Sequence, residues 1–409
     1  MRHCLPVVLG CLGMLAGGVA SIASEENPTL LEAITKGSPT LSFRYRYENV
    51  DDDAFDKEAH ASTLRTALGY KTLAWKGLGL YAEAENVTTI GNDLYDNAGA
   101  GSLNNGVTDR PVVADPAITD VNQVYGWFDR GGTNLLLGRE NLAIDDERYV
   151  GPVAWRQHYQ SFDTFHFTNT TLDWARFFYG YVDKVHRING ATWDTSSQLI
   201  NFRFTPIEAV RVTPYAYLLD FENPGQYGLS TATYGLELIG KHKLGEHRSI
   251  NWEAEYATQG DYGGNPGRIS AEYLFLMIGG SFKPLNVTLG YEVLSGSESD
   301  GQFSTPLATL HKFNGWADKF LTTPTDGLKD LYLSLDGALG PAKWLVAYHD
   351  FSAENGQATT GAEYGDELDF QVLYTAPWKQ GFGLAGAMYF ADEFSTDTNK
   401  YWLFTTFKI

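Results

Sequence analysis

Polar and apolar side chains alternate along most of this chain. In residues 41–48, LSFRYRYE, a serine, two arginines and a glutamate occupy every second position, and a leucine, a phenylalanine and two tyrosines lie between them. Because successive side chains of a strand point to opposite sides, this segment is predicted to be a strand with one polar and one apolar, aromatic face. Similar segments follow almost to the last residue.

The alternation predicts eighteen strands, most of them ten residues or longer. They cover residues 40–50, 60–74, 78–89, 121–130, 133–141, 161–170, 172–185, 197–205, 209–221, 231–243, 248–259, 268–282, 285–296, 328–339, 342–353, 364–376, 382–393 and 399–409.

The connections between these segments alternate between short and long. The short turns are 75–77, 131–132, 206–207, 245–246, 283–284, 340–341 and 377–381, and the long polar loops are 50–60, 89–120, 142–160, 186–196, 222–230, 260–267, 297–327 and 353–363. Short turns on one rim and long loops on the other are typical of outer-membrane barrels. Closing the sheet into a barrel also pairs every backbone N–H and C=O group that lies within the lipid. We therefore expect an all-β transmembrane antiparallel barrel over residues 40–409, in the bacterial outer membrane.

The first residues have the architecture of a secretory signal peptide. Residues 1–23 begin with one arginine, continue with a short apolar stretch and end in small residues, so cleavage is expected after Ala23 or Ala20. Both cysteines lie in this segment, and the mature chain is therefore expected to form no disulfide. Residues 24–39 would be a short periplasmic segment ahead of the barrel.

The charge of the chain is strongly negative, with 50 acidic and 30 basic residues. This balance disfavours nucleic acid as a partner, because a phosphate-binding surface needs clustered lysines and arginines. Acidic groups at 51–58 and 145–147 match no EF-hand spacing, and we expect them to be solvated loop faces rather than a calcium loop. No metal and no cofactor is predicted.

In a barrel of about eighteen strands, the inward side chains cannot fill the interior, so a water-filled lumen is expected. Charged residues on the polar faces should line it: Arg44, Arg46, Arg65, Lys71, Glu83, Glu85, Arg139, Arg203, Glu237, Lys241, Glu253, Glu255, Glu292 and Asp369. The opposite faces carry Leu64, Leu80, Phe202, Trp252, Tyr256, Leu289, Tyr291 and Phe370, which suit lipid. The charges either solvate a wet wall or include a selective ring of arginines.

A hydrolase is disfavoured. His158, Ser161 and Asp163 lie close in sequence, but the alternation places the histidine and the serine on opposite faces, and no GxSxG element is present. A catalytic triad needs its nucleophile and base within hydrogen-bonding distance. We therefore predict no enzymatic activity.

The motifs GRE at 138–140, DDERYVG at 145–151, WRQ at 155–157 and SFD at 161–163 resemble the alginate export family of bacterial outer-membrane porins. The short segment TLLEAI at 29–34 and residues 309–320 fit as well. The chain departs from the family pattern at Glu140, Tyr149 and His158, where the family usually has Gln, Phe and Asn.

The resemblance implies a monomeric eighteen-stranded barrel surrounded by lipid and lipopolysaccharide, with Arg139 and Arg156 as pore arginines. The family's founding type exports a polyanionic uronate polymer. Glutamates such as Glu253 and Glu255 would repel such a polymer. We therefore expect a channel for small hydrophilic solutes, with anionic sugars or carboxylates as one class. The alternatives are a dedicated exporter of an acidic exopolysaccharide such as alginate, a closed structural barrel and a barrel-embedded hydrolase.

A second conspicuous segment, TPLATLHKFNGWADKF at 305–320, mixes aromatic and cationic side chains. One interpretation is a plug or gate that contacts the solute through His311, Lys312, Trp316 and Lys319. The other is an ordered external cap that packs on its own apolar residues.

Overall fold

The computed structural model describes residues 28–356 and 361–409, so the predicted signal peptide lies outside the described residues. The described chain begins with one helical turn and a half, α1 (Leu30–Thr35). Thr29 and Glu32 form a capping box that satisfies the first backbone donors of this helix. Among the described residues, no helix is both long and apolar enough to cross a membrane.

Eighteen strands form one antiparallel sheet, as the alternation predicted. They are β1 (Ser38–Asp52), β2 (Ala59–Lys71), β3 (Leu78–Thr89), β4 (Ile118–Arg130), β5 (Thr133–Glu140), β6 (Ser161–Asn169), β7 (Ala175–His186), β8 (Thr192–Ile207), β9 (Val210–Leu219), β10 (Thr231–Lys243), β11 (Arg248–Asp261), β12 (Ser270–Phe282), β13 (Leu285–Leu294), β16 (Leu328–Leu339), β17 (Ala342–Ser352), β18 (Glu363–Thr375), β19 (Gly381–Ala391) and β20 (Thr398–Lys408). A small separate hairpin, β14 (Gly296–Ser297) and β15 (Gly301–Gln302), lies within a long loop.

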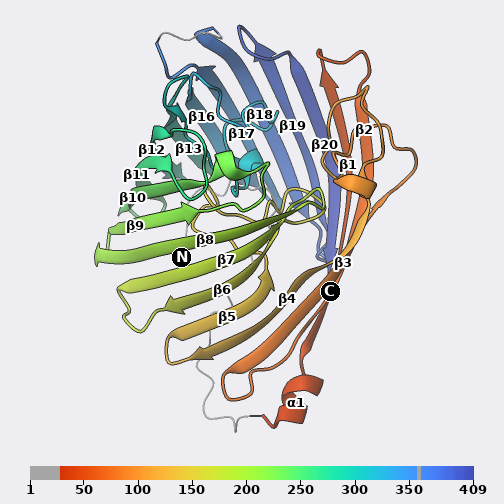
Figure 1. Ribbon diagram of the computed structural model, residues 1–409, viewed down its shortest axis with the longest axis vertical. Helices are drawn as coiled ribbons and strands as arrows, with labels where there is room; N and C mark the ends of the chain where they lie inside the picture. The colour runs from red at the N-terminus through yellow and green to blue at the C-terminus, as the bar shows by residue number, and fades with distance from the viewer. Residues whose placement is uncertain (1–27, 357–360) are drawn as a thin grey trace.

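Each strand pairs with its neighbour in sequence, and β1 pairs with β20 to close the barrel. Figure 1 shows the tilted strands forming a ring, with α1 at one end of it. This is the end of the short turns, because the turn after β2 binds the helix: Leu73 N donates to Ala33 O at 2.9 Å. The closed ring leaves no unpaired sheet edge.

The two faces of the wall differ as the sequence predicted. Arg46, Arg65 and Glu85 point inward and are buried. Leu80 and Leu289 point outward and are about half exposed, together with a band of other large apolar residues from most of the strands. An outward apolar band and a polar interior are the two faces of a barrel that stands in lipid.

Long loops fold into the barrel and pack against its wall. Within the loop between β13 and β16, the ring of Phe320 lies 4.5 Å from Phe351 of β17 and also packs against Tyr364 of β18. In the loop between β5 and β6, Trp155 packs against Trp402 of β20. The interpretation of residues 305–320 as an external cap is therefore wrong. Aromatic residues of the loop bury themselves against aromatic residues of the inner wall.

Placing a charge on the outward face should destabilise the folded barrel. Leu276 of β12 faces outward and is 45% exposed. Leu276→Arg is expected to lose about 2–4 kcal/mol of the free energy of unfolding in phospholipid vesicles, because it puts a cation against hydrocarbon. The matched control is Met277→Arg, since Met277 lines an acidic cavity inside the barrel. Urea unfolding measures both, and equal losses would contradict the assignment of the faces.

Candidate solute pathway

Two inward loops, residues 141–160 and 295–327, are joined to each other inside the barrel. Gly151 N donates to Leu307 O at 2.9 Å, and Thr309 N donates to Glu147 O at 3.1 Å. The side-chain amide of Gln160 also donates to Leu307 O, at 3.1 Å. The loops therefore form one body, which narrows the lumen.

Arginines of β1 hold the first loop against the wall. Arg44 donates to Ala154 O at 2.7 Å and, through Nε, to the side chain of Gln157 at 2.8 Å. Arg46 donates to Trp155 O and pairs with Asp115 of the loop after β3. A loop carbonyl that is buried away from water needs a hydrogen-bond donor from the protein. Each guanidinium group supplies several such donors.

A second set of contacts links the same loop to β2 and β3. Arg65 pairs with Glu85 at 2.7 Å and with Glu83 at 3.5 Å. Its guanidinium also lies over the ring of Tyr159, 4.2 Å from the centroid. Glu85 binds His158 as well. These predicted pore residues point into the lumen, and their side chains are occupied by the loop.

The loops meet at a buried carboxylate, Asp318. It binds Arg156 at 3.2 Å, Lys400 of β20 at 2.7 Å and His311 Nδ1 at 2.7 Å, and Arg156 also pairs with Glu48 of β1. These three partners hold the pKa of Asp318 well below its usual range despite its burial. Burial lowers the pKa of His311, although Asp318 opposes this shift.

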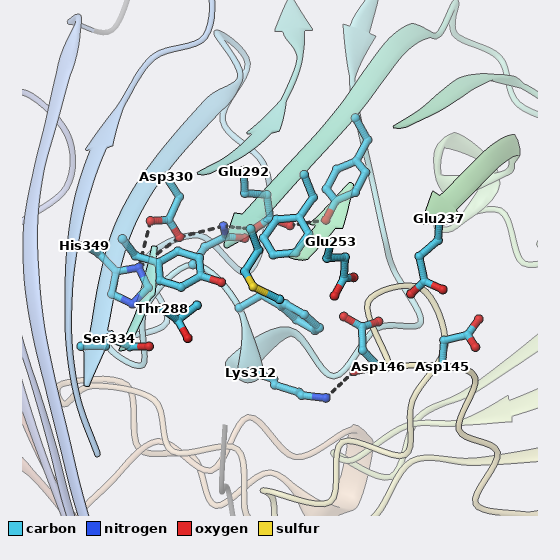
Figure 2. A pocket seen from close by; sticks show the side chains of 18 of the residues that line it. Asp145, Asp146, Glu237, Glu253, Thr288, Glu292, Lys312, Asp330, Ser334 and His349 are labelled. Carbon is cyan, nitrogen blue, oxygen red and sulfur yellow. Dashed lines mark hydrogen bonds and ion pairs between the residues drawn. The ribbon is translucent and has the colours of Figure 1, made fainter. Parts of the chain in front are cut away.

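A cavity of about 510 Å³ lies between this loop body and the wall. Figure 2 shows its polar side chains pointing into the space from β10 to β17 and from both loops. Its acidic and basic lining consists of seven carboxylates, three cations and one histidine: Asp145, Asp146, Glu237, Glu253, Glu292, Asp330, Asp369, Arg203, Arg211, Lys312 and His349. The cavity is therefore acidic.

Ion pairs neutralise part of this lining. Arg203 pairs with Asp145, and Arg211 pairs with Glu237 at 3.0 Å. Asp330 binds His349 at 2.9 Å, as Figure 2 shows. Glu292 is bound by Arg148 of the loop at 2.8 Å. Burial alone would lower the pKa of that arginine, but Glu292 and the neighbouring Tyr273 raise it. Lys312 donates to the carbonyl of Asp146.

A second cavity of about 380 Å³ opens at the end of the short turns. It is basic: Lys241, Lys243, Arg248 and Lys283 face only two acids, Glu246 and Asp336, with His247 beside them. Thr288 of β13 lines both cavities. The two spaces therefore lie in sequence along the barrel, an acidic one beside the loops and a basic one at the opposite mouth.

The remaining sequence candidates lie at other places in the barrel. Arg139 pairs with Asp163 across β5 and β6 at 2.8 Å. Lys71 lies at the short-turn rim over the ring of Trp127. Of the loop candidates, Trp316 lines the acidic cavity and its backbone N donates to Asp369 at 3.3 Å, and Lys319 binds Asp52 at 2.8 Å. Their roles in transport stay predictions.

Sequence reasoning misplaced two acids and missed three further residues of the acidic cavity. Asp145 and Asp146 were expected on a solvated loop face, but the loop turns inward and places them at the acidic cavity (Figure 2). Arg211, Asp330 and His349 lie on inward strand faces, so the alternation alone could have identified their side. It could not show that they stand at the same height, because height depends on strand register.

The three residues considered for a hydrolase do not come together. His158 binds Glu85, and Asp163 binds Arg139 and His186. The hydroxyl of Ser161 is buried and has no hydrogen-bond partner within the described chain.

No family model matches the sequence, and no curated protein matches it. Solved structures do match. OccK1 (OpdK) of Pseudomonas aeruginosa has a TM-score of 0.72 at 16% identity, covering 91% of this chain and 98% of that one. OccAB2 of Acinetobacter baumannii has a TM-score of 0.72 at 14% identity, with 92% and 99% covered. OpdQ of Pseudomonas aeruginosa has a TM-score of 0.70 at 13% identity, with 92% and 99% covered.

These likenesses show a shared fold, the closed eighteen-stranded barrel. A further crystal structure of OpdK, which also matches, is described as that of an outer membrane protein. None of the structures compared above is described as an alginate exporter. The coarser part of the sequence assignment, a barrel of the outer-membrane porin type, is therefore supported, and the alginate export family is not.

Removing the carboxylate at which the loops meet should loosen them. Asp318→Asn leaves Lys400 and Arg156 buried with one carboxylate fewer. Breaking such a buried network is expected to lower the free energy of unfolding by about 3–5 kcal/mol. The urea midpoint of the refolded barrel measures it. Asp109→Asn is the control, because Asp109 pairs with Lys57 on the surface, where both side chains are more than half exposed. Its midpoint should not move.

Acid should lower the stability of the folded barrel through His311. Its pKa is lowered in the folded protein, whereas the unfolded imidazole takes up a proton near pH ~6.5. The unfolded state therefore binds more protons below that pH, and the folded state loses stability as pH falls through it. We expect a wild-type urea midpoint that drops between about pH 7 and pH 5 more than that of His311→Gln. An identical pH dependence in the two proteins would contradict this.

Proposed function

We propose that this protein is an outer-membrane channel for passive passage of small hydrophilic solutes. The observation that carries the proposal is the pair of cavities that share Thr288 inside a closed barrel with an apolar outer band. The band suits lipid and lipopolysaccharide, and the polar interior suits a solute in water. Both cavities are built from one chain, which is consistent with a monomer.

The structural neighbours support a small solute rather than a polymer. OpdK, at 16% identity, has also been crystallised with vanillate, an aromatic carboxylate. In this chain the two inward loops are bonded to each other and to several strands, so a polymer would have to separate them. Glu253, an acid in the lumen without an ion pair among the described residues, also disfavours a polyuronate. The export of alginate or a similar acidic polysaccharide is thus the weaker candidate.

The charges along the pathway give the channel two different ends. The acidic cavity favours cations, and the basic mouth around Lys241 favours anionic groups such as carboxylates. The sequence hypothesis of anionic solutes is thus supported at one end only. Small ions must pass both regions, and the acidic one contains Glu253, a carboxylate that forms no ion pair within the described part of the chain.

Planar-bilayer recording tests the proposal. The refolded wild type is expected to give steady single-channel currents with a modest preference for potassium over chloride under a salt gradient. With EDTA in both baths to remove divalent ions, Glu253→Gln should reduce that preference, and Lys241→Gln should increase it, because each removes one charge from its cavity. Persistent silence of protein that is shown to be folded would refute the channel and favour a closed structural barrel.

A further inference from the structure

Three buried carboxylates converge on the inner wall at the acidic cavity. Glu237 of β10 lies opposite Glu255 of β11 in the strand register, and Glu253 is two residues away on the same face of β11. One carboxylate oxygen from each lies within 4.8 Å of the others. Carboxylates this close repel each other strongly unless a cation or a proton compensates them.

The chain itself supplies partners for two of the three. Glu237 is paired with Arg211 at 3.0 Å. Glu255 accepts hydrogen bonds from Tyr215 and, at 3.0 Å, from Tyr149 of the inward loop. These partners explain why two acidic side chains are held at this position, but they leave the third unexplained.

Glu253 has no such partner. It is only 9% exposed, yet within residues 28–356 and 361–409 its carboxylate accepts no hydrogen bond and forms no ion pair. Figure 2 shows it pointing toward Glu237 and toward Asp146 of the inward loop. A mostly buried carboxylate without a partner is costly. Because Glu253 also lines a cavity with room for an ion and its water ligands, its position indicates a cation from outside the chain.

Charge and donor chemistry indicate which cation. Glu237, Glu253, Glu255 and Asp146 together with Arg211 sum to a charge of −3, and one divalent ion lowers this to −1. All donors are oxygens, which hard cations prefer. Calcium binds its oxygens at about 2.3–2.6 Å, so oxygens on opposite sides of one ion stand about 5 Å apart, in agreement with the observed spacing. The adjoining cavity leaves room for water ligands.

We propose that Glu237, Glu253 and Glu255 bind a divalent cation of the calcium type, with Asp146 as a ligand from the inward loop. The ion would tie the loop between β5 and β6 to β10 and β11, beside the hydrogen bond that Tyr149 already makes to Glu255. The site itself is independent of transport. Its consequence for transport, a loop held in place while solute passes, rests on the proposed channel function.

Terbium luminescence tests the site, because Tb³⁺ replaces calcium and is excited through nearby tyrosines such as Tyr149 and Tyr215. The protein is refolded in detergent free of lipopolysaccharide, which itself binds divalent ions. The wild type is expected to show saturable tyrosine-sensitised emission that added Ca²⁺ displaces. Glu253→Gln should bind terbium at least tenfold more weakly. The control Asp336→Asn should bind it normally, since Asp336 is an inward carboxylate of the other cavity, bonded to Asn286.

Unchanged terbium affinity in folded Glu253→Gln, or wild-type emission that calcium does not displace, would overturn the site. Heat-modifiable migration on a gel shows whether each variant is folded. If Glu253→Gln does not fold, the wild type decides alone: its urea midpoint should be higher in Ca²⁺ than in EDTA, and equal midpoints would overturn the proposal. If the protein binds terbium but conducts no current, the channel proposal is refuted and the cation site is supported. If it conducts current but does not bind terbium, the cation site is refuted and the channel is supported.

Discussion

The binding of wall arginines to the inward loops is the interaction on which the rest of this structure depends. A wall of eighteen strands encloses more space than its own side chains can fill, and the loops occupy much of it. Loop backbone placed there must find donors for its carbonyls. Arg44 and Arg46 of β1 provide these donors, and Arg156 of the first loop pairs with Asp318 of the second. The shape of the lumen thus follows from a few charged contacts rather than from the strands alone.

The strands themselves could be predicted well. Their number, their order and the side of each face follow from a two-residue period, because that period is a direct consequence of strand geometry. Arg65 inward and Leu80 outward illustrate this. The interpretation of the inward arginines was less complete. The alternation shows that Arg46 points to the lumen, but it cannot show that Asp115 and Trp155, far away in sequence, meet it there.

The candidate site depends on information that the pattern of one strand does not contain. Asp146 belongs to an acidic run that resembles any solvated loop, and only the interlocked loops turn it inward. Glu237 and Glu253 come from different strands and converge because of the register between β10 and β11. Register is set by side-chain packing and turn geometry across the whole sheet. For the same reason the likeness to other barrels gives the fold and leaves the solute to be decided by this chain's own charges.

Those charges link selectivity to loop position. With the histidine neutral, seven carboxylates and three cations give the acidic cavity a formal charge of −4, and one bound divalent ion would halve it to −2. The same ion would hold the loop that carries Asp145 and Asp146, two of the seven. Loss of the ion would therefore change two properties together: the cavity would attract cations more strongly, and mutual repulsion would push the acidic loop away from the acidic wall. Because the loop also holds Tyr149 against Glu255, such a movement would alter the width and the charge of the pathway at the same point.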